Sequence, residues 1–210
     1  MEWSLGRKKN LTLDLSTAFL YSVPMNKLFS ALSLAIESHK TQTRLINGQK
    51  ISYVCHPLEV YRWLLDLGET DEDTLCAALL HDSVEDADNR LLAAMEVKGI
   101  GDKIWNIVEE LTLPISAVTN DNREEKLRIK YAHIGHTLTH GSLAAKKVKL
   151  ADRICNVGDY LSNGDVDKGR KYYMMFREVI PSTLWDNKDR VVMKLLMHFN
   201  WLKASLKIVD

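Results

Sequence analysis

The chain has 210 residues, of which 46% are hydrophobic, and its 28 basic and 28 acidic residues give a formal net charge of zero. This length accommodates one domain with a full core. The balance of charge argues against a nucleic-acid partner, because proteins that bind the phosphate backbone carry an excess of Lys and Arg. No apolar run approaches the ~18 residues that a membrane span needs, so no membrane partner is expected.

The first part of the chain divides near residue 24. Residues 1–24 have a mixed composition and are interpreted as an N-terminal extension, whereas residues 25–210 are interpreted as a single domain. A helix is predicted from Met25 to about His39, because apolar residues recur on one face at Leu28, Ala31, Leu32, Ala35 and Ile36.

A small hairpin and a histidine that precedes a proline follow. Asn47-Gly48 lies between two short β-prone runs, which predicts a β-hairpin near residues 44–54. Proline disfavours the α region for the residue before it and suits the first turn of a helix. His56, which precedes Pro57, is therefore expected just ahead of a helix that Gly68 ends.

The remainder of the chain reads as helices. Thr70 with Asp73 three residues later resembles a capping box that opens the next helix. The 3.6-residue spacing of apolar positions predicts further helices at 91–97, 102–111, 122–139, 142–161, 165–179 and 186–207, with a polar loop at 115–122. The fold class expected is all-α, a helical bundle with one small β-hairpin.

The stretch from Ala77 to Asp86 concentrates polar chemistry at the end of an apolar helix. His81, Asp82, Glu85 and Asp86 place one imidazole and three carboxylates within six positions, with members of the set one helical turn apart. Such a cluster repels itself unless a cation neutralises it. The alternative interpretation is a solvated acidic helix end.

Four residues could together hold a metal ion. His and carboxylate ligands that converge from separate elements form mixed sites, and His56, His81, Asp82 and Asp152 are of the right kinds. Asp152 lies beside a core-facing stripe, where an acid is usually paired or liganded. Its alternative role is a salt bridge to Lys149 or Arg153 on its own helix.

Three motifs in order resemble a known family. They are His56-Pro57, then Ala78-Leu-Leu-His81-Asp82-Ser-Val-Glu85-Asp86, then Lys149-Leu-Ala-Asp152-Arg-Ile-Cys-Asn156. Together they resemble the HD-domain hydrolases of the RelA/SpoT alarmone family, in particular the small stand-alone kind. The resemblance covers about residues 27–160 and, more loosely, the rest of the chain.

The resemblance implies a fold, a cofactor and a reaction. It implies an all-α HD-domain bundle and one Mn²⁺ ion held by four residues, His56, His81, Asp82 and Asp152. It further implies that Glu85 and Asp86 orient or deprotonate the attacking water and that Asn156 contacts the nucleotide sugar. The implied reaction is hydrolysis of the 3′-pyrophosphate of ppGpp or pppGpp, yielding GDP or GTP and pyrophosphate.

The substrate side departs from the family pattern. Members of the family usually have a Gln-x-Arg-Lys-Asp-Gly-like loop before the His-Pro motif. This chain has a longer loop without the Lys-Asp pair, in which Arg44 could still stack on a purine. After Asn156 the family's basic residue is replaced by Gly158. Lys168 and Tyr172, one turn apart, are candidates for the phosphate and base contacts, with a solvated helix face as the alternative.

Two other functions stay open. One is an HD phosphohydrolase that acts on another nucleotide, such as an adenosine alarmone, a dNTP, a deoxynucleoside monophosphate or NADPH. The other is a non-catalytic protein that binds a nucleotide or a protein. Three cysteines without a CxxC motif favour free, buried thiols and a cytoplasmic location. Trp185 and Trp201 could pack on the core or on the partner in a homo-oligomer.

Overall fold

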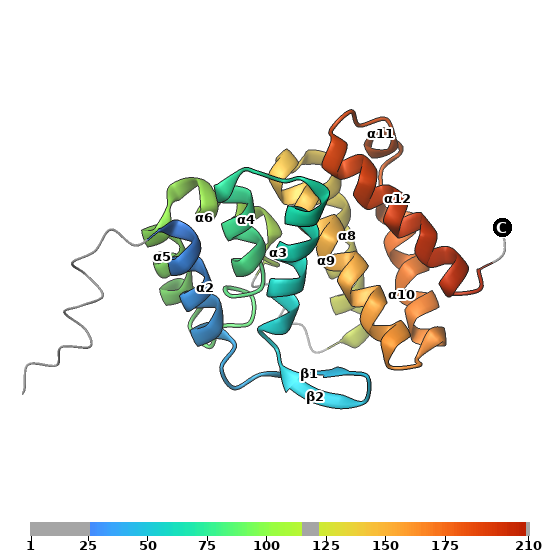
Figure 1. The fold of residues 1–210 in the computed structure, drawn as a ribbon, viewed down its shortest axis with the longest axis horizontal. Coiled ribbons are helices and arrows are strands. Elements are labelled where there is room, and N and C mark those ends of the chain that lie inside the picture. The colour runs from blue at the N-terminus through green and yellow to red at the C-terminus, as the bar shows by residue number, and fades with distance from the viewer. Residues whose placement is uncertain (1–25, 115–121, 209–210) are drawn as a thin grey trace, which may run out of the picture.

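The computed structural model describes residues 26–114 and 122–208 as a helical bundle with one small hairpin (Figure 1). The expected N-terminal extension, and the polar loop apart from Asn122, lie outside the described residues. In chain order the elements are α2 (Lys27–Ser38), β1 (Thr43–Ile46), β2 (Gln49–Ser52), α3 (Cys55–Leu67), α4 (Glu72–Leu80), α5 (Arg90–Ile100), α6 (Asp102–Leu111), α8 (Arg123–His140), α9 (Leu143–Ser162), α10 (Val166–Val179), α11 (Ser182–Trp185) and α12 (Arg190–Ser205).

The predicted hairpin is confirmed. β1 and β2 pair antiparallel, from Thr43 opposite Ser52 to Ile46 opposite Gln49. Asn47 and Gly48 both adopt positive φ, 50° and 74°, as a two-residue hairpin turn requires. Figure 1 shows the hairpin at the end of the bundle where α3 begins, so it lies beside the first turn of that helix.

Most helices agree with their sequence signals, but several bounds differ, and the helix predicted at 186–207 begins only at Arg190, after its cap Asp189. Asp71, not Thr70, caps α4, because its carboxylate accepts a hydrogen bond from the Thr74 amide. The helix predicted at 91–97 extends to Ile100, because Gly99 is tolerated inside it and Gly101 follows its end. The short helix α11 was not predicted, since four residues carry too little periodicity to detect.

Helix α9 lies at the centre of the core. It packs against α3, α4, α6, α8, α10 and α12. Helix α4 is buried from Asp73 to Leu80, which is why its sequence lacks the polar face of a surface helix. Because α3 packs on both α4 and α9, the start of α3, the end of α4 and the middle of α9 approach one another.

A buried lysine near the start of α9 links three elements of the core. Lys147 of α9 lies 2.7 Å from Glu69 and 3.0 Å from Asp189, so one ammonium links the α3–α4 turn to the start of α12. Trp185 packs against the core, whereas Trp201 remains 64% exposed. Among the described residues, every helix is too short or too polar to traverse a bilayer.

Candidate metal centre and active site

His56 enters the site from the first turn of α3. The helix begins at Cys55, so His56 is its second residue and lies within the helix, not ahead of it as the Pro57 signal predicted. Proline at the third position costs no hydrogen bond, because the first amides of a helix have no partner within it. The His56 side chain is 1% exposed, and its Nε2 atom faces α4 and α9. Cys55 is exposed, so its predicted burial is wrong, while Cys76 and Cys155 are buried.

His81 and Asp82 enter from the end of α4. His81 is the C-cap of that helix, and its Nδ1 atom lies 2.8 Å from the Ala78 carbonyl oxygen. A carbonyl accepts a hydrogen bond, so Nδ1 carries the proton and the lone pair of Nε2 points into the site. The chain beyond His81 leaves the helix. Glu85 and Asp86 therefore lie in a turn beyond the helix, where the Asp86 amide donates to the Asp82 carbonyl oxygen over 3.0 Å, so Asp82 and Asp86 keep the expected one-turn spacing.

Asp152 enters from the middle of α9, where it is 2% exposed. Its Oδ1 atom lies 3.3 Å from His56 Nε2 and 4.0 Å from His81 Nε2. Its Oδ2 atom lies 2.7 Å from Arg153 Nη2. The predicted salt bridge to Arg153 is thus confirmed, and it leaves the other oxygen of Asp152 facing the histidines.

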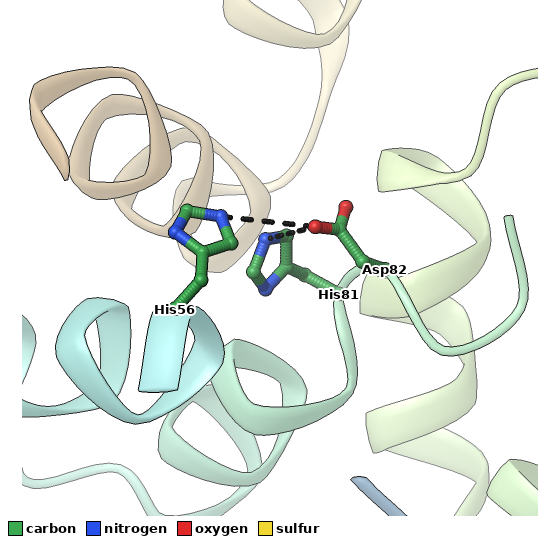
Figure 2. Close-up of side chains that lie close together, drawn as sticks. All are labelled: His56, His81 and Asp82. Carbon is green, nitrogen blue, oxygen red and sulfur yellow. Dashed lines mark ion pairs between the residues drawn. The ribbon is translucent and has the colours of Figure 1, made fainter. Parts of the chain in front are cut away.

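Three of the four candidate metal ligands form one cluster, and the fourth, Asp152, lies beside it against the two histidines. Figure 2 shows the imidazoles of His56 and His81 turned toward the Asp82 carboxylate, whose Oδ2 lies 3.7 Å and 3.1 Å from their Nε2 atoms. One ligand atom each from His56, His81 and Asp82 lies within 4.8 Å of the others. Three separate elements of the fold therefore deliver two imidazoles and two carboxylates to the same place.

This set of donors fits a divalent ion. The Nε2 atom of His81 is buried and has no hydrogen-bond partner among the described residues. A buried polar atom without a partner is costly, and a cation coordinated to its lone pair would satisfy it. Burial disfavours the charged form of Asp152, but the adjacent Arg153 guanidinium holds the pKa of that carboxyl below its usual value. Two ionised carboxylates and a free imidazole lone pair suit Mn²⁺, Fe²⁺ or Zn²⁺.

Glu85 and Asp86 lie beside this centre. Glu85 is half-buried, and its Oε2 accepts a hydrogen bond of 3.3 Å from the Leu113 amide. Asp86 reaches the surface, yet partial desolvation, followed by the charges of Asp82 and Glu85, raises its pKa to about 6. A carboxylate with a raised pKa exchanges protons readily near neutral pH, which suits a general base.

Three of the four candidate substrate residues share one cavity. Arg44 donates to Asn156 Oδ1 over 2.8 Å and also pairs with Asp159. Arg44, Asn156 and Lys168 line a cavity of about 340 Å³. Arg44 also lines a second cavity of about 260 Å³ that reaches His56, so the space around Arg44 adjoins the metal centre.

Tyr172 is less accessible than predicted. Its ring lines a neighbouring cavity of about 330 Å³ together with Lys168, but its hydroxyl accepts a hydrogen bond from Arg153. Lys168 is exposed and pairs with Asp165 at the rim. The structure therefore places Tyr172 between the candidate substrate cavity and the ligand Asp152.

Sequence reasoning missed Tyr53 and underrated Arg153 and Asp159. The Tyr53 hydroxyl donates to Asp82 over 2.7 Å, Arg153 grips Asp152, and Asp159 holds Arg44. The only signal for Tyr53 was its position, a large aromatic residue three positions before His56 in the short connection between β2 and α3. No pattern in the sequence pointed from Asp159 to Arg44, which lie 115 positions apart.

Sequence comparison relates this chain to a known family. Residues 31–171 match the model of a family described as HD domain. A Xenopus tropicalis protein named guanosine-3′,5′-bis(diphosphate) 3′-pyrophosphohydrolase MESH1 is 40% identical over 133 residues, which are 63% of this chain and 68% of that protein. The Drosophila melanogaster protein of the same name is 32% identical over 178 residues, 82% of this chain and 92% of that protein.

A solved structure is also similar. It is described as a metazoan ortholog of SpoT that hydrolyzes ppGpp and plays a role in starvation responses. It superposes with a TM-score of 0.64 at 26% identity and covers 86% of this chain and 98% of its own. The elements that carry the candidate metal ligands, α3, α4 and α9, all lie within the residues 31–171 that match the HD domain family.

Proposed function

The chain belongs to the HD domain family, and we propose that it is a metal-dependent 3′-pyrophosphohydrolase of guanosine-3′,5′-bis(diphosphate). Water attacks the phosphorus atom next to the ribose 3′-oxygen, the bond between them breaks, and the 3′-oxygen takes a proton. The products are pyrophosphate and GDP, or GTP when the substrate is pppGpp. One observation carries the proposal: His56, His81, Asp82 and Asp152 converge around the unpartnered Nε2 atom of His81.

His56, His81, Asp82 and Asp152 are proposed to hold one divalent ion, which we take to be Mn²⁺ because of the resemblance and not because of ligand preference. When bound, the ion would supply positive charge that stabilises the phosphoryl oxygens and favours ionisation of water. The hydrogen bond between His81 Nδ1 and the Ala78 carbonyl keeps the imidazole in the orientation and tautomer that binding requires. Tyr53 restrains Asp82 in the same way.

Glu85 and Asp86 are proposed to act on the attacking water. The raised pKa of Asp86, about 6, means that it is largely ionised at neutral pH and can accept a proton. Glu85 is held by the Leu113 amide at a fixed position beside it, which supports a role in orienting the water. The two carboxylates thus divide orientation and proton transfer between them.

The nucleotide is proposed to lie in the cavities around Arg44. Arg44 is held from behind by Asp159 and Asn156, so its guanidinium is fixed before a purine stacks on it. Lys168, at the rim of the same cavity, would contact a phosphate, and the ring of Tyr172 would face the ligand from the adjoining space. Asn156 lies between Arg44 and Asp152, where a ribose joins the base to the reacting group.

Residues 25–210 are proposed to form one phosphohydrolase domain, which is supported by a hydrophobic core with members from α2 to α12. A cytoplasmic location and a homo-oligomer stay predictions. The absence of an excess of positive charge still favours a small nucleotide over a nucleic acid as the partner.

A nucleotide panel tests the function. The purified protein is incubated with ppGpp, pppGpp, the adenosine alarmones, dNTPs, deoxynucleoside monophosphates and NADPH, each with Mn²⁺ and with EDTA. We expect pyrophosphate release from ppGpp and pppGpp that requires Mn²⁺. Orthophosphate or triphosphate release from another nucleotide would instead favour a different HD phosphohydrolase. Stoichiometric Mn²⁺ binding without any turnover would favour the sequestering protein.

A further inference from the structure

The two oxygens of Asp152 face different groups. Oδ1 faces His56 Nε2 and His81 Nε2 and also accepts a hydrogen bond from Asn156. Oδ2 faces away from the histidines and accepts two hydrogen bonds from Arg153, from Nε over 3.0 Å and from Nη2 over 2.7 Å. The carboxylate is therefore held with one defined oxygen toward the candidate metal ligands.

Arg153 is itself held in place by Tyr172. It is 5% exposed, its Nη1 atom donates to the Tyr172 hydroxyl, and its guanidinium carbon lies 5.4 Å from the centre of the Tyr172 ring. Arginine presents its donors in a rigid planar fork, so the bond to Tyr172 on α10 also fixes the donors that hold Asp152. A continuous contact thus runs from Tyr172 through Arg153 to Asp152.

We propose that Arg153 is a positioning residue that orients Asp152 for metal binding, and that Tyr172 acts on the metal centre through Arg153. The inference rests on the proposed function, because it takes Asp152 as a ligand of the divalent ion. Rotation of the Asp152 carboxylate would break both Arg153 bonds, since both end on Oδ2. Without Arg153 the terminal torsion of an aspartate is broad, and Oδ1 would face the histidines only part of the time.

Charge alone does not account for this arrangement. A cation next to a metal ligand repels the metal ion, so removal of the Arg153 charge would strengthen metal binding while loss of orientation would weaken it. Lys149 already places a second ammonium 3.7 Å from the same Oδ2 atom. A neutral substitution therefore mixes two opposite effects, whereas a charge-preserving substitution isolates the orientation.

Arg153→Lys is the decisive variant, because it keeps the charge and removes the planar fork. We expect its dissociation constant for Mn²⁺, measured by calorimetry and by the EPR signal of free Mn²⁺, to rise about tenfold or more. Tyr172→Phe keeps the ring and removes the hydroxyl, and we expect a smaller rise of several-fold in the same constant. These measurements need no nucleotide, so they stand apart from the identity of the substrate.

Lys147→Met is the matched control, since Lys147 is another buried cation of α9 whose partners, Glu69 and Asp189, lie away from the metal centre. We expect it to lower stability and leave Mn²⁺ affinity unchanged. An Arg153→Lys variant that stays folded and binds Mn²⁺ within twofold of the unchanged protein would overturn the positioning role. A Tyr172→Phe variant that changes only KM for the nucleotide would overturn the part assigned to Tyr172. If the unchanged protein bound no Mn²⁺, the metal site itself would fail and the inference with it.

Discussion

Tyr53 directly follows strand β2, and its hydroxyl donates a hydrogen bond to Asp82 Oδ2 over 2.7 Å. Burial, followed by the Asp82 charge, raises the pKa of Tyr53, so the hydroxyl stays a donor at neutral pH. The hairpin is thereby tied to a candidate metal ligand that comes from a different element. This contact gives the hairpin a role at the metal centre besides the substrate contact proposed for Arg44.

Tyr53→Phe tests that role. The ring remains to pack against His39 and His56, and only the hydrogen bond to Asp82 is lost. We expect kcat/KM for ppGpp hydrolysis to fall by about tenfold, because outer partners of metal ligands orient them. Tyr61→Phe removes a hydroxyl from α3 that makes no hydrogen bond to Asp82, so this control should leave kcat/KM unchanged. Equal values for both variants would remove Tyr53 from the site.

Asp82→Asn tests the metal centre as a whole. The amide keeps the size of the side chain but cannot supply an anionic ligand, so we expect Mn²⁺ binding and activity to be lost together. The loss of turnover should be on the order of a thousandfold, because metal catalysis is worth several kcal/mol. Asp66→Asn, at a 62% exposed carboxylate on α3, is the matched control. Activity that persists without bound metal would contradict the assignment.

Glu85→Gln distinguishes a role in metal binding from a role in orienting the attacking water. Glu85 lies beside the centre and accepts a hydrogen bond from the Leu113 amide, which a glutamine oxygen can keep. We therefore expect Mn²⁺ affinity to change little while kcat falls by about a hundredfold, because a water that is no longer held in line attacks less often. Asp88→Asn removes an exposed carboxylate from the same segment and serves as the control. Unchanged turnover would exclude Glu85 from the mechanism.

Arg44→Ala tests the substrate cavity. If Arg44 grips the nucleotide equally in the ground state and the transition state, its loss raises KM and leaves kcat almost unchanged. We expect KM for ppGpp to rise by about tenfold. Arg62→Ala, at an exposed arginine on α3, should change neither constant. A fall in kcat without a change in KM would instead place Arg44 at the reacting group.

Most of the fold could be predicted from the sequence, because the signals for helices and hairpins lie in residues that are close together along the chain. Asn47-Gly48 marked the hairpin turn, and the helix at 102–111 was predicted with the bounds that the structure has. Thr70 was mistaken for the cap of α4 because Thr70 and Asp71 are both good capping residues, and only the geometry shows which carboxylate or hydroxyl meets an amide. The helix α11 is too short to show a period.

The site was less predictable than the fold. His81 and Asp82 stood out because their cluster is improbable at the end of an apolar helix. The residues that orient the ligands did not stand out, because Tyr53 and Arg153 are ordinary residues whose role depends on contacts between elements. Arg44 and Asp159 illustrate the same limit, since they lie 115 positions apart and meet only where α9 passes the hairpin.

The buried ammonium of Lys147 supplies a test of stability that is separate from catalysis. Lys147→Met keeps much of the side-chain volume but leaves Glu69, which is 6% exposed, without its cation. We expect the free energy of unfolding at pH 7 to fall by about 3 kcal/mol, the lower end for breaking a buried ion pair, because two backbone amides still bond to Glu69. Denaturant unfolding in EDTA measures this loss without a contribution from bound metal.

The loss of unfolding free energy caused by Lys147→Met should be smaller at acidic pH. Burial opposes ionisation of Asp189, but the Val192 amide and the Lys147 ammonium hold the pKa of that carboxyl below its usual value of 3.8. A depressed folded-state pKa contributes stability that is present above the unfolded-state pKa and is lost as pH falls through the folded-state pKa. The difference in unfolding free energy between the unchanged protein and Lys147→Met should therefore be full at pH 7 and decrease below about pH 4. A difference that stays constant between pH 7 and pH 3 would mean that Lys147 stabilises α9 through the packing of its methylene chain and not through its pair with Asp189.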